Sequence, residues 1–354
     1  MNNKKILFLI PDLKCGGSER VTSLLCNFGS KRGYTVFVLT YDSSPNYFSL
    51  EETVKHIRLN LKSKTRVGRL FERKKKISSI IESVNPDIIF APHFHSLFYC
   101  AGLFGRKVII GSERSSPYKN IGLVKKIIRN SLFRRCSAVI FQTNGARDYY
   151  KKLKIKKTLV VQNPVDDSFF LNGHCDSGQT ITSVGNLKPE KDYQTLITAF
   201  SISRQKHPEI ELNIVGDGPE LKNLQHLCKT LNVFDSVHFL GRVKNVSDVL
   251  FKTTIFVLSS KYEGMPNSLL EAMCAGLPCI STNCRFGPAD IISHKVDGLL
   301  VDVGEPKSLS ESINLLLDNK EFRETLSFAA LNKRLSNSSE AICNKYYLFF
   351  EELL

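Results

Sequence analysis

The chain lacks any apolar run of the length that crosses a membrane. A spanning helix needs about 20 consecutive apolar residues, whereas the first apolar stretch, residues 6–10, is broken by Pro11 and Asp12. That stretch follows a basic start, as in a signal peptide, but it is too short and no small-residue cleavage site follows it. We therefore predict no spanning helix and interpret residues 6–10 as the first strand of a parallel sheet.

Metal-type cysteine spacings are also missing. None of the ten cysteines forms a Cys-x-x-Cys pair, and no histidine stands at a ligand-like spacing from them. Cys274, Cys279 and Cys284 follow one another at five-residue steps, which is typical of core or loop positions. We therefore expect structural thiols in a reducing cytosol and no zinc site.

Acidic residues are scarce in the first half of the chain. Residues 1–170 hold 31 Lys and Arg against 12 Asp and Glu, a net charge of +19, whereas residues 171–354 have a net charge of −4. The basic residues gather over residues 62–76, 123–135 and 151–157. This asymmetry predicts an anionic partner for the first half, either a membrane surface or a nucleic acid.

Strand and helix patterns alternate along both halves, which predicts two parallel, doubly wound α/β sheets. The rhythm restarts after Asn163-Pro164, and 354 residues suit two domains. We predict domains at residues 1–165 and 166–340 that face each other across a cleft, and a last segment, 341–354, that packs across the boundary. Predicted strands cover residues 6–10, 35–40, 87–91, 108–111, 138–142, 180–184, 211–215, 237–240, 255–258, 279–281 and 298–301. Predicted helices cover residues 18–30, 74–84, 123–135, 193–206 and 221–231.

The most informative segment places two carboxylates, Glu263 and Glu271, eight residues apart at a strand–loop–helix junction. Open α/β sheets bind ligands at the carboxyl ends of strands. A helix that begins near Asn267 would direct unpaired N–H groups and its positive dipole end into the loop, where a phosphate fits. Glu271, one turn into the helix, can accept hydrogen bonds from hydroxyl groups. A pair of acid/base carboxylates is the other interpretation.

Two further loops follow strands and open helices. Gly16 and Gly17 would allow a phosphate to approach the backbone closely, but they match neither Gly-x-Gly-x-x-Gly nor a P-loop, and a tight turn explains them equally. Lys191 is placed where its ammonium group could meet a diphosphate, although an ordinary solvated lysine would look the same.

Taken together, these segments resemble the retaining glycosyltransferases of family 4, whose GT-B fold consists of two Rossmann-like domains. The resemblance covers nearly the whole chain and is strongest over residues 180–305. The matching segments are residues 16–20, 184–191, 215–220, 239–243, 263–271, 287–292 and 297–301.

The resemblance implies roles for these residues. Residues 1–165 would bind the acceptor, and residues 166–340 would bind a nucleotide-sugar donor. Glu263 would face the donor sugar, Lys191 would neutralise the diphosphate leaving group, and Glu271 would bind the ribose hydroxyls. The other donor-binding residues would be Gly16, Gly17, Asn186, Arg242, Val243, Gly264, Met265, Pro266, Asn267 and Ser268. No cofactor or metal is expected, because no Asp-x-Asp pair lies near these motifs and lysine, helix dipole and N–H groups can stabilise the leaving group.

Two positions depart from the family pattern. Many members carry Arg where this chain has Asn186, so one charge partner of the diphosphate is missing. Several members also place a His near the donor sugar, where this chain has Arg114 after a strand. We therefore predict that Arg114 is the third catalytic residue, beside Glu263 and Lys191, and serves the pyrophosphate or the acceptor. His93 and His95, at another strand end, are alternative acceptor-side residues.

The resemblance predicts a retaining enzyme that transfers a hexose or N-acetylhexosamine to a lipid-linked glycan in the synthesis of lipopolysaccharide or capsule. It also implies a UDP-sugar as the donor, because UDP is the usual nucleotide in this family. A basic acceptor domain then predicts a cytoplasmic protein docked on the inner face of the plasma membrane, where each basic residue contributes about 1 kcal/mol. The predicted helix 123–135 would present Val124, Ile127, Ile128 and Leu132 on one face, although a solvated core helix fits the same pattern.

Two other classes remain open at the level of sequence. A GT-B enzyme of another specificity, such as a phosphorylase, an epimerase or an enzyme that glycosylates lipids or small molecules, would share the same motifs. A nucleic-acid-binding protein fits the charge alone, but no helix-turn-helix, RNA-recognition or zinc pattern occurs.

Overall fold

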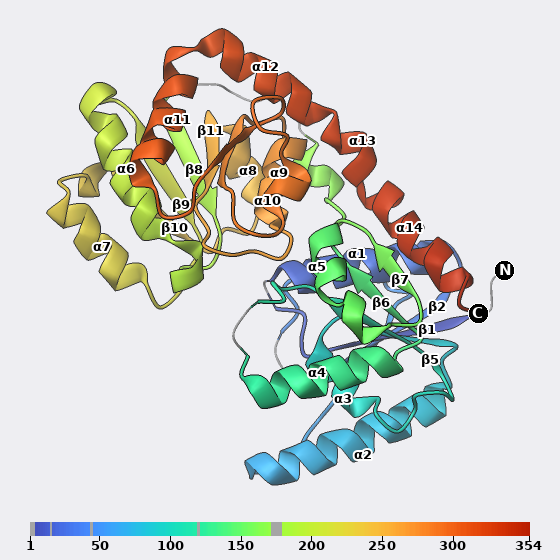
Figure 1. The fold of residues 1–354 in the computed structure, drawn as a ribbon. Coiled ribbons are helices and arrows are strands. Elements are labelled where there is room, and N and C mark those ends of the chain that lie inside the picture. Colours follow the sequence, from blue (N-terminus) through green and yellow to red (C-terminus); the bar gives the residue numbers. More distant parts are fainter. Residues whose placement is uncertain (1–3, 15, 43–44, 119–120, 171–178) are drawn as a thin grey trace. The chain divides into compact units, whose positions relative to one another are not determined.

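A computed structural model describes residues 4–14, 16–42, 45–118, 121–170 and 179–354 (Figure 1). The chain forms two compact units, one of Met1–Pro164 with Ser339–Leu354 and one of Val165–Ser338. Residues 171–178, which follow the predicted boundary between the halves, lie outside the described residues. Each unit is a parallel α/β sheet, so the predicted fold class of two doubly wound domains is confirmed.

The first unit is built on a seven-stranded parallel sheet in the order β3-β2-β1-β4-β5-β6-β7. Its strands are β1 (Lys5–Ile10), β2 (Thr35–Thr40), β3 (Lys55–Arg58), β4 (Ile88–Ala91), β5 (Val108–Glu113), β6 (Ala138–Phe141) and β7 (Thr158–Val160). Ile6, Phe8 and Ile10 of β1 enter one core, whereas Leu7 and Leu9 enter the other. Both faces of the sheet are therefore covered, which explains the continuous apolar run of this strand.

Helices cover the two faces of this sheet separately. α1 (Gly17–Lys31) and α14 (Ser339–Glu351) supply the core on one face. The other face is covered by α2 (Arg66–Val84), α3 (Phe94–Tyr99), α4 (Leu123–Arg135) and α5 (Asn144–Tyr149). Tyr346, Tyr347 and Phe350 of α14 are fully buried, so the last helix of the chain belongs to the first unit.

The second unit repeats the same plan with a six-stranded parallel sheet in the order β10-β9-β8-β11-β12-β13. Its strands are β8 (Thr180–Val184), β9 (Glu211–Val215), β10 (Val237–Gly241), β11 (Ile255–Leu258), β12 (Cys279–Thr282) and β13 (Leu299–Val301). One core is formed with α6 (Tyr193–Lys206), α7 (Leu221–Thr230) and α11 (Pro306–Asp318). The other is formed with α8 (Val246–Phe251), α9 (Asn267–Cys274), α10 (Pro288–Ile291) and α12 (Lys320–Leu331), and α13 (Lys333–Asn337) packs on α9.

The predicted elements differ from the structure in several places. The helix predicted over residues 74–84 begins at Arg66, where Thr65 caps it by accepting a hydrogen bond from the Gly68 N–H. Val67, Leu70 and Phe71 stand at helical spacing in the first turns of this helix, but all three are exposed and lie outside the core. Strands β3 and β7, which are short strands at the edges of the sheet, were missed. The helices α3, α5, α8, α10, α11, α12 and α13 were not predicted either.

In both units the strand order reverses direction at one place, between β1 and β4 and between β8 and β11. Ligands of doubly wound sheets bind outside the carboxyl ends of the strands at such a switch point. The glycine loop and His93 follow β1 and β4, and the loops with Lys191 and Glu263 follow β8 and β11. No helix within the described residues has the length and apolarity to span a bilayer.

Candidate active site

Lys191 and Glu263 meet across the switch point of the second unit. The Lys191 Nζ atom lies 2.5 Å from Glu263 Oε1, and the Ser260 hydroxyl donates a hydrogen bond of 2.6 Å to the same oxygen. Both side chains are largely shielded from solvent, with 21% and 11% exposed. The sequence therefore placed both residues on the correct loops, and the fold brings them into contact.

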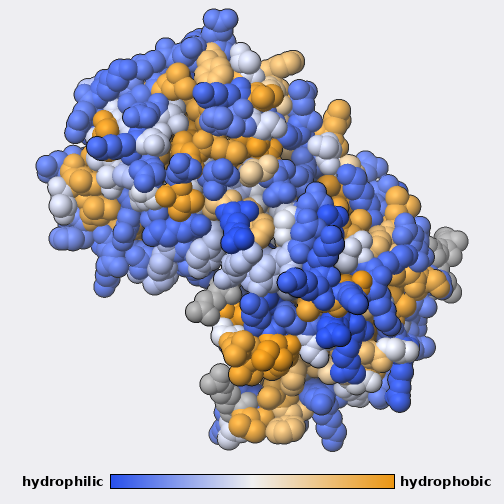
Figure 2. All heavy atoms as spheres, in the orientation of Figure 1, coloured by the Kyte–Doolittle hydropathy of each residue, from blue (hydrophilic) through white to orange (hydrophobic). Residues whose placement is uncertain are grey.

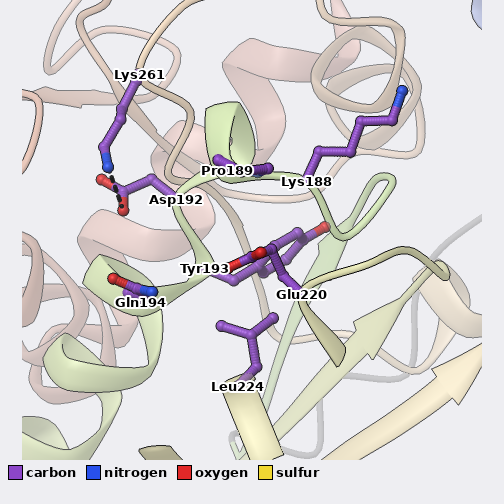
Figure 3. A pocket seen from close by; sticks show the side chains of 8 residues that line it. All are labelled: Lys188, Pro189, Asp192, Tyr193, Gln194, Glu220, Leu224 and Lys261. Atoms are coloured by element: carbon purple, nitrogen blue, oxygen red, sulfur yellow. Dashed lines mark ion pairs between the residues drawn. The ribbon is translucent and has the colours of Figure 1, made fainter. Parts of the chain in front are cut away.

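The backbone around Lys191 is held from the β11 side. Ser259 Oγ donates to the Lys191 carbonyl at 2.9 Å, and the Lys261 N–H donates to the Glu190 carbonyl at 2.9 Å. Lys261 Nζ also lies 3.2 Å from Asp192 Oδ1, a buried carboxylate at the start of α6 (Figure 3). These contacts fix the backbone of the short 3-10 turn Pro189–Lys191, from which the Lys191 side chain extends.

The small pocket drawn in Figure 3 lies between the Lys261–Asp192 ion pair and the start of α7. Its lining residues are Lys188, Pro189, Asp192, Tyr193, Gln194, Glu220, Leu224 and Lys261. Tyr193 lies under the β8 loop and donates its hydroxyl hydrogen to the Gly185 carbonyl at 3.0 Å. Burial raises the pKa of the Tyr193 hydroxyl, so it stays a neutral donor.

The loop from Glu263 to Asn267 leads into α9, as the sequence predicted. Asn267 is the first residue of this helix, and Glu271 lies one turn later with 6% of its surface exposed. The loop packs against Gly287, which has a φ of +91°, and a side chain there would meet the Gly264 carbonyl oxygen at 2.7 Å. Only glycine fits this contact, so the residues Gly264, Met265, Pro266, Asn267 and Ser268 are supported from behind by the β12 loop.

The loops after β8, β9 and β10, the first of which carries Asn186, are joined by backbone hydrogen bonds. The Leu187 N–H donates to the Asp217 carbonyl at 3.0 Å, and the Gly216 N–H donates to the Gly241 carbonyl at 2.8 Å. Arg242 follows directly, and its Nε lies 3.8 Å from Asp217 Oδ2 on an exposed surface. Val243 is the next residue, so the predicted nucleobase-side pair stands at the end of β10.

In the first unit, the glycine loop and His93 meet across the other switch point. Gly16 is the N-cap of α1 and Gly17 its first residue. The Ser18 hydroxyl lies 3.1 Å from His93 Nε2, and Glu19 Oε1 lies 3.8 Å from the same nitrogen. His93 therefore joins the end of β4 to the first turn of α1.

The remaining two predicted residues have structural partners within the first unit. The His95 ring contacts the Phe94 ring at a tilt of 34°, with centroids 3.8 Å apart. Burial, together with the nearby His93 and Lys125, lowers the pKa of His95, which keeps it neutral near pH 7. Arg114 Nη2 donates to Asn163 Oδ1 at 2.5 Å, and Arg114 Nη1 donates to the Tyr346 hydroxyl at 3.4 Å. Arg114 thus ties the end of β5 to the last residues of the unit's first segment and to α14.

The sequence did not indicate the residues that position these side chains: Asp192, Ser259 and Ser260 in the second unit, and Ser18 in the first. Ser18, Asp192 and Ser259 each contact a residue on another loop, which nothing in the local sequence marks, whereas Ser260 contacts Glu263 on its own loop. Among the described residues, no group of three or more His, Cys, Asp or Glu side chains is arranged to hold a metal ion.

Two family descriptions match the chain and together span almost all of it. "Glycosyl transferases group 1" matches residues 165–333, and "Glycosyltransferase Family 4" matches residues 15–169. The family 4 description matches the first unit, and the group 1 description matches the second.

Curated relatives and solved structures agree with this match. The GalNAc-alpha-(1->4)-GalNAc-alpha-(1->3)-diNAcBac-PP-undecaprenol alpha-1,4-N-acetyl-D-galactosaminyltransferase of Campylobacter jejuni is 25% identical over 91% of this chain and 91% of its own length. The amylovoran biosynthesis glycosyltransferase AmsD of Erwinia amylovora is 26% identical over 97% of this chain and 98% of its own length. The structure of Anabaena Alr3699/HepE with UDP and glucose has a TM-score of 0.84 at 18% identity, covering 99% and 100% of the two chains, which shows a shared fold.

Proposed function

The chain belongs to the family 4 glycosyltransferases, and we propose that it is a retaining enzyme that transfers a sugar from UDP to a lipid-linked glycan. The observation that carries the proposal is the contact between Lys191 and Glu263 across the β8–β11 switch point, next to the first turn of α9. A cation, a carboxylate and a helix N-terminus at one sheet edge are the groups that a nucleotide sugar requires.

Lys191 is proposed to stabilise the departing diphosphate. Cleavage of the bond between the sugar and the diphosphate leaves negative charge on the phosphate oxygens, and a fixed ammonium group stabilises that charge without reorganisation. Glu263 holds Lys191 at 2.5 Å and would face the donor sugar, while the N–H groups from Gly264 to Ser268 orient sugar and phosphates. Retention, by front-face attack assisted by the leaving phosphate, is proposed from the family resemblance.

The nucleotide end would occupy the neighbouring loops. Glu271, buried on α9, is proposed to accept hydrogen bonds from the ribose hydroxyls, and Arg242 and Val243 to flank the base. Asn186 would donate a hydrogen bond to the diphosphate in place of the usual Arg, and Gly16 and Gly17 would admit the phosphate to the backbone of the first unit. The complex of HepE with UDP supports UDP as the nucleotide.

The acceptor is proposed to be a polyprenyl-linked glycan at the inner membrane face, in cell-surface polysaccharide synthesis. Supporting this, the Campylobacter relative is named for an undecaprenol-diphosphate glycan and the Erwinia relative for amylovoran biosynthesis. The net charge of +19 in residues 1–170 suits an anionic surface. Arg114 is proposed as the third catalytic residue, which serves the pyrophosphate or the acceptor, and His93 and His95 are the proposed acceptor-side residues.

A screen of nucleotide sugars for protection against thermal unfolding tests the proposal. A ligand at 100 times its dissociation constant stabilises the folded state by about 2.7 kcal/mol, so the correct donor is expected to raise the melting temperature while other nucleotide sugars do not. Lys191→Ala and Glu271→Ala should lose this protection. Lys222→Ala, an exposed change on α7, serves as the control and should keep it. Protection by none of the nucleotide sugars, or full protection of both site variants, would contradict the proposal.

A further inference from the structure

The first turns of α2 and α4, both in the first unit, expose apolar side chains to solvent. On α4, Leu123, Val124 and Ile127 are 73%, 70% and 59% exposed. On α2, Val67 and Phe71 are 66% and 69% exposed, and Leu70 is exposed as well. Both helices pack against α3. Clustered exposed apolar side chains of this kind mark an interaction surface.

In α4 the usual burial pattern of a core helix is reversed, because apolar side chains are exposed and an arginine is buried. Its Arg129 side chain is 2% exposed and donates from Nη1 to Glu113 Oε2 at 3.2 Å, and its guanidinium group lies over the Tyr150 ring. Leu132 and Phe133 anchor the last turns in the core. The apolar side chains of the first two turns are therefore exposed while a cation is buried. Leu132, predicted on one face with Val124, Ile127 and Ile128, is buried whereas the other three are exposed.

Cations predominate around this surface, and the one carboxylate among the first turns of α2, Glu72, is 19% exposed and lies 2.8 Å from Lys76 Nζ. α4 contains no acidic residue, and its Lys125, Lys126, Arg134 and Arg135 are exposed. Arg69, Lys74 and Lys75 are exposed on α2. Figure 2 shows apolar side chains gathered over the first turns of α4, in the lower part of the view. Exposed apolar side chains surrounded by cations suit an anionic bilayer, because the cations can reach the headgroups while the apolar side chains enter the hydrocarbon region.

We propose that α2 and α4 form a membrane-insertion surface, in which Val67, Leu70, Phe71, Leu123, Val124 and Ile127 enter the outer acyl region of an anionic bilayer. The proposal rests on the proposed function for its lipid-linked acceptor, but it deepens it: attachment is apolar as well as electrostatic. Added salt screens only the electrostatic share. Binding to anionic vesicles is therefore expected to fall, yet to persist in part, at 0.5 M salt, about the ionic strength at which charge attraction reaches only a few ångströms.

The chain contains no tryptophan, so a single introduced one reports its own surroundings. Leu123→Trp is expected to shift its fluorescence to the blue and to be quenched by brominated acyl chains when vesicles containing phosphatidylglycerol are added. Phe328→Trp, at a side chain of the second unit that is 72% exposed, is the matched control and should show neither effect. Equal responses of the two reporters, or none from Leu123→Trp, would overturn the insertion.

Loss of function gives an independent measurement. The double change Leu123→Ser with Ile127→Ser is expected to lower partitioning into these vesicles at least about tenfold, because buried apolar area is lost. Phe328→Ser should leave partitioning unchanged. Unchanged partitioning of the double variant, or binding to duplex DNA with none to vesicles, would refute the proposal. Thermal protection by the donor is measured on the same variants, so failure to bind vesicles with intact donor protection rejects the insertion surface and leaves the catalytic proposal standing.

Discussion

At the scale of single residues, the site depends on pairs that are far apart in the sequence. Lys191 and Glu263 are 72 positions apart, yet Ser260 and Lys191 contact the same carboxylate oxygen. In the absence of a diphosphate, the carboxylate keeps the ammonium group from being an unpaired charge in a shielded place, which would be costly. An arriving diphosphate gives Lys191 a second anionic partner at the same position.

Replacing Lys191 by Ala is expected to lower turnover about 100-fold, by analogy with the loss of one donor to a developing anion. The reason is that negative charge on the leaving diphosphate loses its fixed cation. Steady-state transfer kinetics with the donor found in the screen measure the effect. Lys222→Ala on α7 is the matched lysine control, and wild-type turnover of Lys191→Ala would remove this residue from the reaction.

At the scale of elements, glycines allow the loops of the second unit to touch. A side chain on Gly218 would meet the carbonyl oxygen, carbonyl carbon and nitrogen of Leu187 at 2.3–2.8 Å. These are backbone atoms and cannot rotate away. The close packing of the β8 and β9 loops, which carries Asn186 to its place, therefore requires glycine at this position.

Gly218→Ala is thus expected to destabilise the second unit by about 1–3 kcal/mol, the usual cost of overpacking. It should also weaken nucleotide binding, because the Asn186 loop must shift. Gly102→Ala is the control, since a side chain there meets nothing within 4 Å. Thermal unfolding with and without nucleotide measures both effects, and equal behaviour of the two variants would show that the loop contact is not needed.

At the scale of the whole molecule, the chain returns to its first unit at the end. α14 follows the second unit in sequence but buries Ile342, Tyr346, Tyr347 and Phe350 in the core of the first. The Tyr347 hydroxyl donates to the Leu25 carbonyl at 2.9 Å, which links α14 to α1. The first unit is therefore incomplete until the last residues of the chain are present.

Phe350→Ala is expected to lower the stability of the first unit by about 3–5 kcal/mol, the range for deleting a buried phenylalanine. Leu348→Ala, on the same helix but half exposed, should change it by no more than about 0.5 kcal/mol. Denaturant unfolding followed by amide hydrogen exchange assigns each loss to a unit. Equal losses from both changes would mean that α14 does not complete the core.

Local patterns in the sequence predicted most of the strands and the helices α1, α4, α6 and α7, because apolar runs and helical spacing are local properties. The sequence by itself also determined the glycine loop, the Lys191 loop and the Glu263–Glu271 segment, since each motif is contiguous. Charge counts separated the basic first half from the second. The edge strands β3 and β7, the first turns of α2 and the helices α3, α5, α8, α10, α11, α12 and α13 were not predicted. The strands and five of these helices are six residues long or shorter, so each offers too few positions for a period to stand out.

Tertiary structure alone decided which loops meet. The strand order places β1 beside β4 and β8 beside β11, so His93 reaches Ser18 and Lys191 reaches Glu263. It also decided that Arg129 lies buried while Leu123 is exposed on the same helix. The physical reason is that pairing, burial and ion contacts join residues far apart in the chain, and their energies depend on packing that no single segment contains.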